Sequence, residues 1–499
     1  MLLTTAWSLA TPLTASPDEP AHFVRAGAVA QGQPIGTVND TSDYPYVQVP
    51  EFIADTRVMT CFAGNQTLTA DCQDEVSDDQ TIVESQSTGS LNSPVYYALV
   101  GWPSLVLSGA PALYAMRIVS ALLTSLFLTT MVVALLAQSR SWWPVIASVV
   151  GVTPMVLFLG GSLNPNALEV AAAGAVLSLL TLMLRRPLTQ KQLWLAGSLT
   201  IGSAVALTSG RSIGLLWLAI AGVAALISVP WSTVVDLLKR PPVWFTLAGI
   251  AVAVVGTITW VAVYGAATAD ASAKVVEPRA PGLTTVVLLM VETTFDYWQG
   301  WIGQFGWIDY AAPAGVAVVW FGAIAAVLFC GFALTKGRAR VALVVVAAAA
   351  FIVPPAVQAS FYNELGMMWQ GRYAIPLYLC VLILAGLALD DTFPGSRVST
   401  ARKAVVGGVV VLGIAQVAAF IFVLRRYVIG TQTWIDMIQA PAWQPPLGWI
   451  ALVVIYAATW AGIVALVARW TQVDPDNELL AQSEAPQSAV PQHVAAARQ

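Results

Sequence analysis

Charged residues are scarce in this sequence. Only 10% of its 499 residues are Asp, Glu, Lys or Arg, against about 25% in an ordinary soluble domain. The formal net charge of −4 offers no basic surface, so we expect no nucleic-acid binding. Two histidines and four cysteines support neither a zinc site nor a Ser-His-Asp triad well. We also find no P-loop, no GxGxxG in a nucleotide-binding context, no HExxH and no G-x-S-x-G.

Apolar residues are abundant instead and make up 57% of the chain. Apolar runs recur from end to end, many longer than the roughly 18 residues that indicate a spanning helix. We therefore predict an all-α polytopic membrane protein. No Lys or Arg precedes residues 1–15, so no cleavable signal peptide is evident. That run is short for a membrane span. Either the true start of the protein lies upstream, or this helix is partly buried among other helices. The twelve predicted spans are 1–15, 112–137, 141–160, 166–184, 192–209, 212–229, 243–264, 312–334, 340–357, 373–389, 404–424 and 447–468.

The distribution of basic residues between loops predicts the orientation. With the N-terminus inside, thirteen fall in short cytoplasmic segments, and nine are spread over longer external ones. This matches the positive-inside rule and predicts a plasma-membrane protein with both termini in the cytoplasm. The internal set is Arg140, Arg185, Arg186, Lys191, Lys239, Arg240, Lys336, Arg338, Arg340, Arg397, Arg402, Lys403 and Arg469. The external set is Arg25, Arg57, Arg117, Arg211, Lys274, Arg279, Arg372 and the locally conflicting pair Arg425 and Arg426.

Two long external loops, 16–93 and 265–311, belong to a single transmembrane domain over residues 1–469. Cys61 and Cys72 lie in the first loop, where a disulfide can persist. Residues 94–108 and a segment near 284–300 are apolar and aromatic but short, so we expect helices at the membrane interface. The polar tail, 470–499, is predicted to be disordered and cytoplasmic.

The stretch SPDEPAHF, residues 16–23, places two acids and a histidine where the chain first leaves the membrane. One interpretation is a helix start, with Ser16 as N-cap and Glu19 completing a capping box. Asp18 would also complement the helix dipole, but that interpretation leaves His22 and Arg25 unexplained, which would share one helical face with Asp18. Ionisable residues beside a membrane form a functional-site hypothesis.

Other polar residues fall at the external ends of predicted spans. Asn164 and Asn166 form an Asn-Pro turn, with Glu169 about one turn into the next span, where an acid needs a partner. Arg211 and Arg372 either snorkel to the interface or face a polar pocket. The aromatic residues either form an interfacial belt or line that pocket. The candidate lining residues are Tyr96, Tyr97, Asn164, Asn166, Trp307, Asp309, Gln370 and Tyr373.

Five segments together resemble the GT-C superfamily of glycosyltransferases, which use polyprenyl-phosphate sugars as donors. Within it, the chain is most similar to a bacterial family of predicted polytopic membrane proteins whose domain has no assigned function. The segments are spread over residues 16–376 and read SPDEPAHF, NSPVYYAL followed by Arg117, GSLNPNALE, GQFGWIDY and WQGRYAIP. The fold implied is a GT-C-like bundle with a long first external loop and interfacial helices.

The resemblance implies that Asp18 is a general base with Glu19 as its partner, the two being candidate ligands of a divalent cation (Mg, Mn or Ca). We add His22 to this catalytic group as a residue that tunes Asp18. Relatives more often carry Asp at the position of Asn166 and Lys at that of Arg211. The first difference removes a charge, and the second keeps the charge but changes its geometry. The cations expected to bind the donor phosphate are Arg372, Arg211 and Arg25.

External carboxylates facing external arginines suit group transfer from a lipid phosphate. A carboxylate accepts the proton of the attacking hydroxyl, and cations stabilise the departing phosphate. The leading hypothesis is transfer of a sugar from a polyprenyl-phosphate donor to a glycan or lipid-linked acceptor of the cell envelope, outside the membrane. One alternative is a transporter or flippase of a lipid-linked precursor, which would need a polar path through the bundle. Another is a non-catalytic scaffold that uses the acidic first loop as a docking surface.

Overall fold

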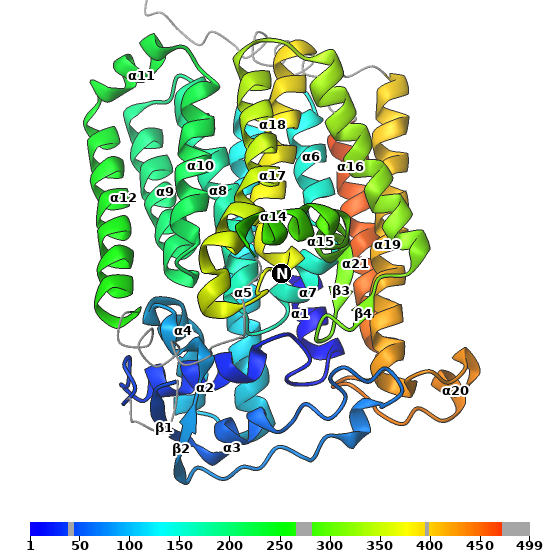
Figure 1. Cartoon of the computed structure of the whole chain (residues 1–499). Helices are drawn as coiled ribbons and strands as arrows, with labels where there is room; N and C mark the ends of the chain where they lie inside the picture. The colour runs from blue at the N-terminus through cyan, green and yellow to red at the C-terminus, as the bar shows by residue number, and fades with distance from the viewer. Residues whose placement is uncertain (38–43, 266–281, 395–398, 472–499) are drawn as a thin grey trace, which may run out of the picture.

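The computed structural model describes residues 1–37, 44–265, 282–394 and 399–471. Long helices lie side by side in a bundle, and the first loop covers one end of it (Figure 1). The predicted tail, together with Lys274, Arg279 and Arg397, lies outside the described residues, apart from Trp470 and Thr471 of the tail.

The described chain is mostly helical, and its only strands there form two antiparallel pairs. The strands are β1 (Tyr46–Pro50), β2 (Ile82–Gln86), β3 (Gln304–Phe305) and β4 (Tyr310–Ala311). The α-helices are α1 (Leu2–Ala10), α2 (Glu19–Ala30), α3 (Glu51–Ala54), α4 (Pro94–Gly101), α5 (Gly109–Gln138), α6 (Trp143–Gly151), α7 (Pro154–Gly160), α8 (Pro165–Arg185), α9 (Gln190–Gly210), α10 (Gly214–Ile227), α11 (Trp231–Leu238), α12 (Pro241–Trp260), α14 (Leu283–Glu292), α15 (Thr294–Gly303), α16 (Ala314–Leu334), α17 (Gly337–Leu365), α18 (Ile375–Thr392), α19 (Ser399–Ile429), α20 (Trp434–Gln439) and α21 (Trp449–Trp470). Short 3-10 or π turns are η1 (Asp55–Arg57), η2 (Ala70–Cys72), η3 (Thr88–Leu91), η4 (Trp102–Leu105), η5 (Val261–Gly265) and η6 (Gly371–Ala374).

Nine helices in the described ranges are long and apolar enough to cross a membrane: α5, α8, α9, α12, α16, α17, α18, α19 and α21. Two bent pairs, α6 with α7 (65°) and α10 with α11 (109°), raise the number to eleven if each pair is one span. The predicted twelfth span, 1–15, contains only the nine-residue helix α1, which is too short to cross a hydrocarbon core about 30 Å thick. Its Ala6, Trp7 and Ala10 are buried among other helices instead.

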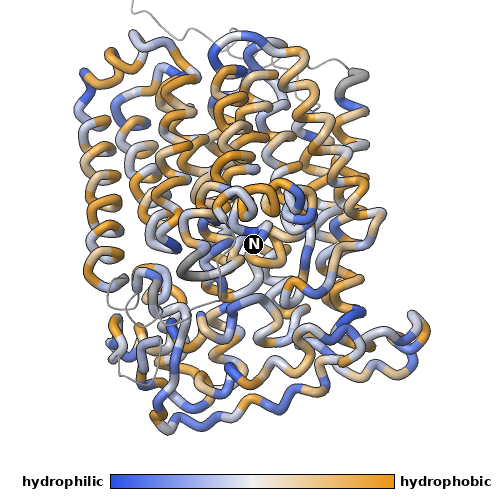
Figure 2. The backbone as a smooth tube through the Cα atoms, viewed as in Figure 1, coloured by the Kyte–Doolittle hydropathy of each residue, from blue (hydrophilic) through white to orange (hydrophobic). Residues whose placement is uncertain are grey.

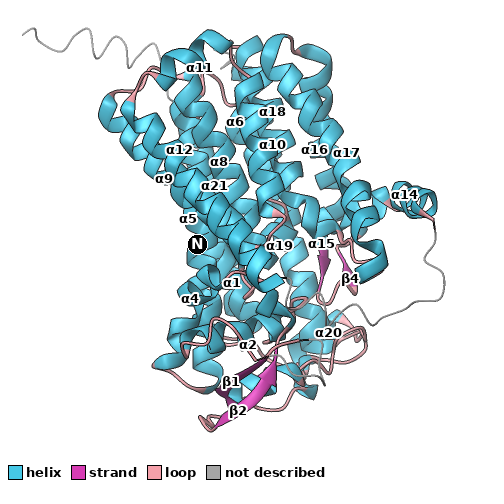
Figure 3. Ribbon diagram, turned by 60° about the vertical axis from the view of Figure 1, so that its left-hand side comes forward, coloured by secondary structure: helices cyan, strands magenta, loops and turns pink. Residues whose placement is uncertain are grey.

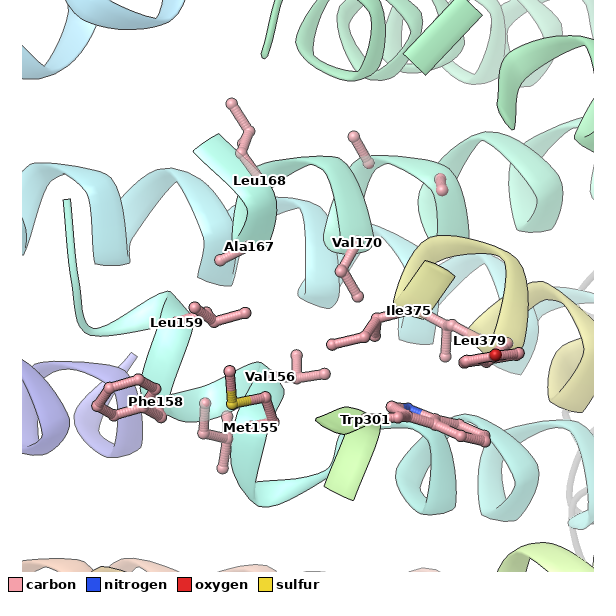
Figure 4. Packing of buried hydrophobic residues seen from close by; sticks show 14 of the residues in the cluster. Met155, Val156, Phe158, Leu159, Ala167, Leu168, Val170, Trp301, Ile375 and Leu379 are labelled. Atoms are coloured by element: carbon pink, nitrogen blue, oxygen red, sulfur yellow. The ribbon is translucent and has the colours of Figure 1, made fainter. Parts of the chain in front are cut away.

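The centre of the bundle is formed by α8 and α18. The most apolar stretch of α8 is 83% buried and that of α18 is 94% buried, against 11% for α12. Side chains of α7, α8 and α18 pack together with Trp301 of α15 in the interior of the bundle (Figure 4). Apolar residues follow the long helices, and hydrophilic ones gather at the bundle ends and in the first loop (Figure 2). The packed centre therefore gives the site a rigid floor.

The first loop is a small folded layer. Helix α2 packs on α4, and strands β1 and β2 pair beside α2, away from the long helices (Figure 3). Cys61 and Cys72 form a disulfide with a Cα–Cα distance of 6.2 Å. The predicted interfacial segments contain short helices, namely α4 with η4 and α14 with α15, and α14 projects from the side of the bundle (Figure 3). Exposed Leu99, Trp102 and Leu105 give the first of these segments an apolar face.

Candidate functional site

Asp18 lies directly before α2 in a left-handed backbone conformation, with φ 64° and ψ 1°. Such a conformation is uncommon for any residue except Gly, although Asp tolerates it better than most. The predicted capping box is wrong, because Asp18 precedes the first helical residue, Glu19, and Ser16 Oγ has no hydrogen-bond partner within the described structure. Strained residues of this kind concentrate at functional sites, where the surroundings hold them in place.

Two distant segments hold the backbone next to Asp18. The carbonyl oxygen of Pro17 accepts hydrogen bonds from Asn164 Nδ2 at 3.0 Å and Arg372 Nη1 at 3.3 Å. Asn164 also caps α8, because its Oδ1 accepts the backbone N–H of Asn166 at 3.0 Å. Asn164 thus joins the first turn of α8 to the loop of Asp18, and its position follows from the Asn-Pro chemistry of the turn.

The carboxylate of Asp18 forms an ion pair with Arg372. Arg372 Nη2 lies 2.5 Å from Asp18 Oδ2, and the side chains are 2% and 49% exposed, respectively. Gln370 Oε1 accepts a second hydrogen bond, from Arg372 Nε at 2.6 Å. Burial acts to raise the pKa of Asp18, but the charges of Arg372 and Arg211 and the hydrogen bond from Arg372 outweigh it and hold the pKa below its ordinary value. Asp18 is therefore an ionised, partly accessible carboxylate at neutral pH.

Arg211 brings a second cation to the same place. Its guanidinium carbon lies 4.0 Å from the centre of the Tyr373 ring, and that of Arg372 lies 5.2 Å from the same ring. Arg211 Nη1 has no hydrogen-bond partner among the described residues. Tyr373 therefore holds two guanidinium groups on one aromatic ring, and one of them keeps a free donor.

Glu169 adds a second acid just beyond the first turn of α8. Asn166 Nδ2 donates to Glu169 Oε2 at 3.1 Å, whereas Oε1 has no partner in the part of the chain that is described. Both residues are buried. The sequence indicates only that Glu169 needs a partner, and the structure identifies Asn166.

A cavity of about 160 Å³ opens beside Arg372. Its walls combine polar and aromatic side chains, a composition typical of sites for small polar ligands. Asp296 and Gln304 reach this cavity; Gln304 belongs to the segment GQFGWIDY but is not among the predicted site residues, and Asp296 lies in none of the five segments. The lining residues are Met155, Asp296, Tyr297, Gly300, Gln304, Ile308, Trp369, Gln370, Gly371 and Arg372.

His22 lies behind Asp18 on α2, where it is buried. Its Nδ1 is 2.9 Å from Tyr97 Oη, which also accepts a hydrogen bond from Asn92 Nδ2 at 2.9 Å. Burial lowers the pKa of His22 to about 4. The imidazole is therefore neutral at pH 7 and contacts Tyr97 in the interior.

Arg25 is fully buried one helical turn further on. Its Nη2 donates to the backbone carbonyl of Asn92 at 3.0 Å, and its Nε and Nη1 have no partner within the described ranges. Tyr97 lies under the guanidinium at 5.7 Å. Tyr96 Oη bonds Ser120 Oγ at 2.9 Å in the interior. Arg25 of α2 and Tyr96 and Tyr97 of α4 thus lie in the interior and form no hydrogen bond with Arg372 within the described residues.

The carboxylate of Glu19 binds Arg117 and does not act together with that of Asp18. Arg117 Nε donates to its Oε1 at 2.8 Å and Arg117 Nη2 to its Oε2 at 2.5 Å, with both side chains completely buried. The backbone N–H of Leu163 donates to Oε1 at 2.8 Å. Because both carboxylate oxygens are engaged, Glu19 is not available to share a cation with Asp18. The described residues contain no group of three or more His, Cys, Asp or Glu arranged for a metal ion.

Trp307 and Asp309 do not form the floor of the pocket. Trp307 Nε1 donates to the carbonyl of Thr14 at 2.9 Å, and Asp309 Oδ2 accepts the backbone N–H of Gly64 at 3.1 Å. Asp309 also lies 3.6 Å from Arg426, which donates to the carbonyls of three first-loop residues: Phe62, Asn65 and Leu68. These side chains fasten the first loop to the bundle. Arg426 conflicts locally with the loop-charge pattern because it binds the first loop.

The fold and the site together define a polytopic helical membrane protein in which Asp18, Arg211 and Arg372 meet at one end of the bundle. The family model described as "Predicted membrane protein (DUF2142)" matches residues 1–381, and the chain belongs to that family. No curated protein matches the chain, and no solved structure does.

Proposed function

We propose that this protein transfers a sugar from a polyprenyl-phosphate donor to a cell-envelope glycan or lipid-linked acceptor. The reaction would take place on the extracytoplasmic face of a bacterial plasma membrane. Both termini would lie in the cytoplasm, and the helices would have a GT-C-like arrangement. The observation that carries it is the ion pair of Asp18 with Arg372, beside a second guanidinium from Arg211.

The ion pair supports an exchange of partners. A donor phosphate that binds Arg372 and Arg211 competes with Asp18 for the guanidinium, because phosphate is a strong bidentate acceptor. Asp18 then loses the charge that lowers its pKa, and it becomes a better base for the acceptor hydroxyl. As the bond between sugar and phosphate breaks, the two arginines stabilise the charge that remains on the phosphate.

Each remaining group has a place in this scheme. Gln370 orients Arg372 through Nε, and Tyr373 stacks with both cations. The cavity beside Arg372 would accommodate part of the sugar or acceptor. A cation held between Asp18 and Glu19 does not fit the residues present, since Glu19 is bound to Arg117, and no step uses one.

The helices that lead away from the site favour an enzyme over a transporter. Residues 373–389 of η6 and α18 contain no charged residue between Arg372 and Asp390, and α8 has none between Glu169 and Arg185. These two helices are also the most deeply buried of the spans. A transporter or flippase would need a polar path there, so the access from one side supports group transfer.

The test is a transfer assay with the full-length protein in liposomes, a panel of labelled polyprenyl-phosphate sugars and envelope acceptors. Asp18→Asn should reduce kcat by about 10²–10⁴-fold, the usual contribution of a general base. Arg372→Gln should raise the donor KM or lower kcat. Asp74→Asn and Arg57→Gln alter exposed first-loop residues outside the site and are the matched controls. Full transfer by a folded Asp18→Asn variant, or no transfer with any donor while a lipid-linked precursor crosses the membrane, would overturn the proposal.

A further inference from the structure

A second and larger cavity lies at the end of the bundle opposite Asp18. It measures about 510 Å³ and is bounded by the ends of α5, α8 and α18 and by α11. Helix α18 begins just after Arg372 and ends beyond Asp391, so it connects the two ends directly. At about 1.5 Å per residue, its length separates the cavities by the thickness of a hydrocarbon core.

Four arginines line this cavity: Arg140, Arg185, Arg186 and Arg240. The two acids that line it, Asp391 and Asp236, already pair with Arg185 and Lys239, respectively.

The other guanidinium groups have no acid partner in the described part of the chain. Arg186 donates to the carbonyl of Gln138 at 2.6 Å and Arg240 to that of Leu188 at 2.8 Å. Arg185 Nη1 is buried without a partner there, and Arg140 makes no side-chain hydrogen bond in those residues. The cavity thus has excess positive charge and free donors, the features that bind phosphate.

Part of the cavity wall is apolar. Met183, Leu184, Leu193, Val229 and Leu237 line the same cavity. A ligand that fits both parts carries an anionic head and an apolar body, because phosphate contacts guanidinium while hydrocarbon contacts the walls. This composition favours an amphiphile over a soluble anion.

Helix α11 forms one side of the cavity. It is bent by 109° from α10 and lies across the bundle end (Figure 1). Trp231 is 67% exposed and Val235 40% exposed, whereas Asp236 and Leu237 line the cavity. A short helix with an exposed aromatic face, perpendicular to the spans, is typical of the interface between headgroups and acyl chains.

We propose that this cavity binds the phosphate-bearing headgroup of an anionic glycerophospholipid, with the start of its acyl chains against the apolar walls. The inference is independent of the reaction at the Asp18 end. Basic pockets between spans on the positively charged side of a membrane protein are suited to anionic lipids.

Full-length protein in a neutral detergent should be titrated with short-chain phosphatidylglycerol, with phosphatidylcholine of the same chain length and with glycerol phosphate. The concentration dependence of the melting temperature then gives an apparent Kd for each compound. The test variant is Arg140→Gln/Arg240→Gln, since both side chains are exposed at the rim. Lys336→Gln/Arg338→Gln is the control, because it removes two exposed charges from the same end outside the cavity.

Wild-type protein should bind phosphatidylglycerol more tightly than the other two compounds. Each arginine near an anionic headgroup contributes roughly fivefold in affinity, so the test variant should bind about 25-fold more weakly. The control should lose much less. Equal losses in both variants would indicate diffuse charge attraction and overturn the proposal. Equal binding of phosphatidylcholine would also overturn it, and equal binding of glycerol phosphate would assign the cavity to a soluble phosphate compound instead.

Discussion

The buried pair of Glu19 and Arg117 provides the sharpest test of how the two adjacent acids differ. Asp18 is 49% exposed and Glu19 is completely buried. Glu19→Gln keeps the size of the side chain but removes the charge that balances Arg117. The guanidinium would then remain buried without a carboxylate, and its acceptors would all be neutral: the glutamine amide oxygen and the oxygens of Ser8, Thr11 and Pro12.

The expected cost is about 3–5 kcal/mol in the free energy of unfolding, which is typical for a buried ion pair that loses one partner. This is a large share of the roughly 5–15 kcal/mol that stabilises most domains. Replacing both residues, as in Glu19→Leu/Arg117→Met, should restore part of the loss because no charge remains buried alone.

The assay is thermal unfolding of the full-length protein in detergent, followed by intrinsic fluorescence from its 19 tryptophans. Asp74→Asn is the control, since Asp74 is exposed in the same loop. Glu19→Gln should melt well below wild type, and the double variant should lie between them. A Glu19→Gln variant that melts like wild type but loses transfer activity would refute this reasoning and assign Glu19 to the catalytic site.

Three further predictions concern the surroundings of the site. Burial lowers the pKa of His22 to about 4 in the folded protein. Between pH 6.5 and 4, the His22 side chain therefore binds a proton more readily in the unfolded chain than in the folded protein. Stability should therefore fall by about 3 kcal/mol as pH drops through this window, and His22→Gln should flatten that part of a plot of melting temperature against pH; an unchanged slope would refute it. Arg426→Met removes three hydrogen bonds to first-loop carbonyls and should increase proteolysis of that loop, while unaltered cleavage would contradict its anchoring function. A Cβ at Gly371 would lie 2.2 Å from the backbone oxygen of Tyr297, so Gly371→Ala should destabilise the protein by about 1–3 kcal/mol. The control, Gly322→Ala, places its Cβ in open space and should leave the melting temperature unchanged. Equal melting temperatures of the two variants would contradict this prediction.

Much of the bundle could be predicted from local sequence. Apolar runs gave ranges close to those of the observed long helices, because a backbone in hydrocarbon must satisfy its hydrogen bonds within the helix. One exception is 141–160, which is the bent pair of α6 and α7 and not a single long helix. Another is 1–15, where the run is apolar but the chain leaves the helix at Thr11. Hydropathy does not reveal where this helix ends, because the end depends on hydrogen bonds. The Thr11 hydroxyl donates to the carbonyl of Trp7, and Arg117 donates to the carbonyls of Thr11 and Pro12.

The candidate site was predicted in part. Asp18, Arg211 and Arg372 meet at one end of the bundle, in agreement with the common side to which the topology assigned them. Trp307 and Asp309 share that side, yet they anchor the first loop. A loop pattern identifies the end of the molecule at which a residue lies, but not the direction of its side chain.

By itself, the sequence determined that this is a membrane protein and that its ionisable residues lie at the ends of the spans, because each property depends on local composition. Only the tertiary structure decided which of two neighbouring acids is available for chemistry. Glu19 finds Arg117 98 residues away, and Asp18 finds Arg372 354 residues away. Pairings at such separations depend on how the helices pack, so no local pattern specifies them.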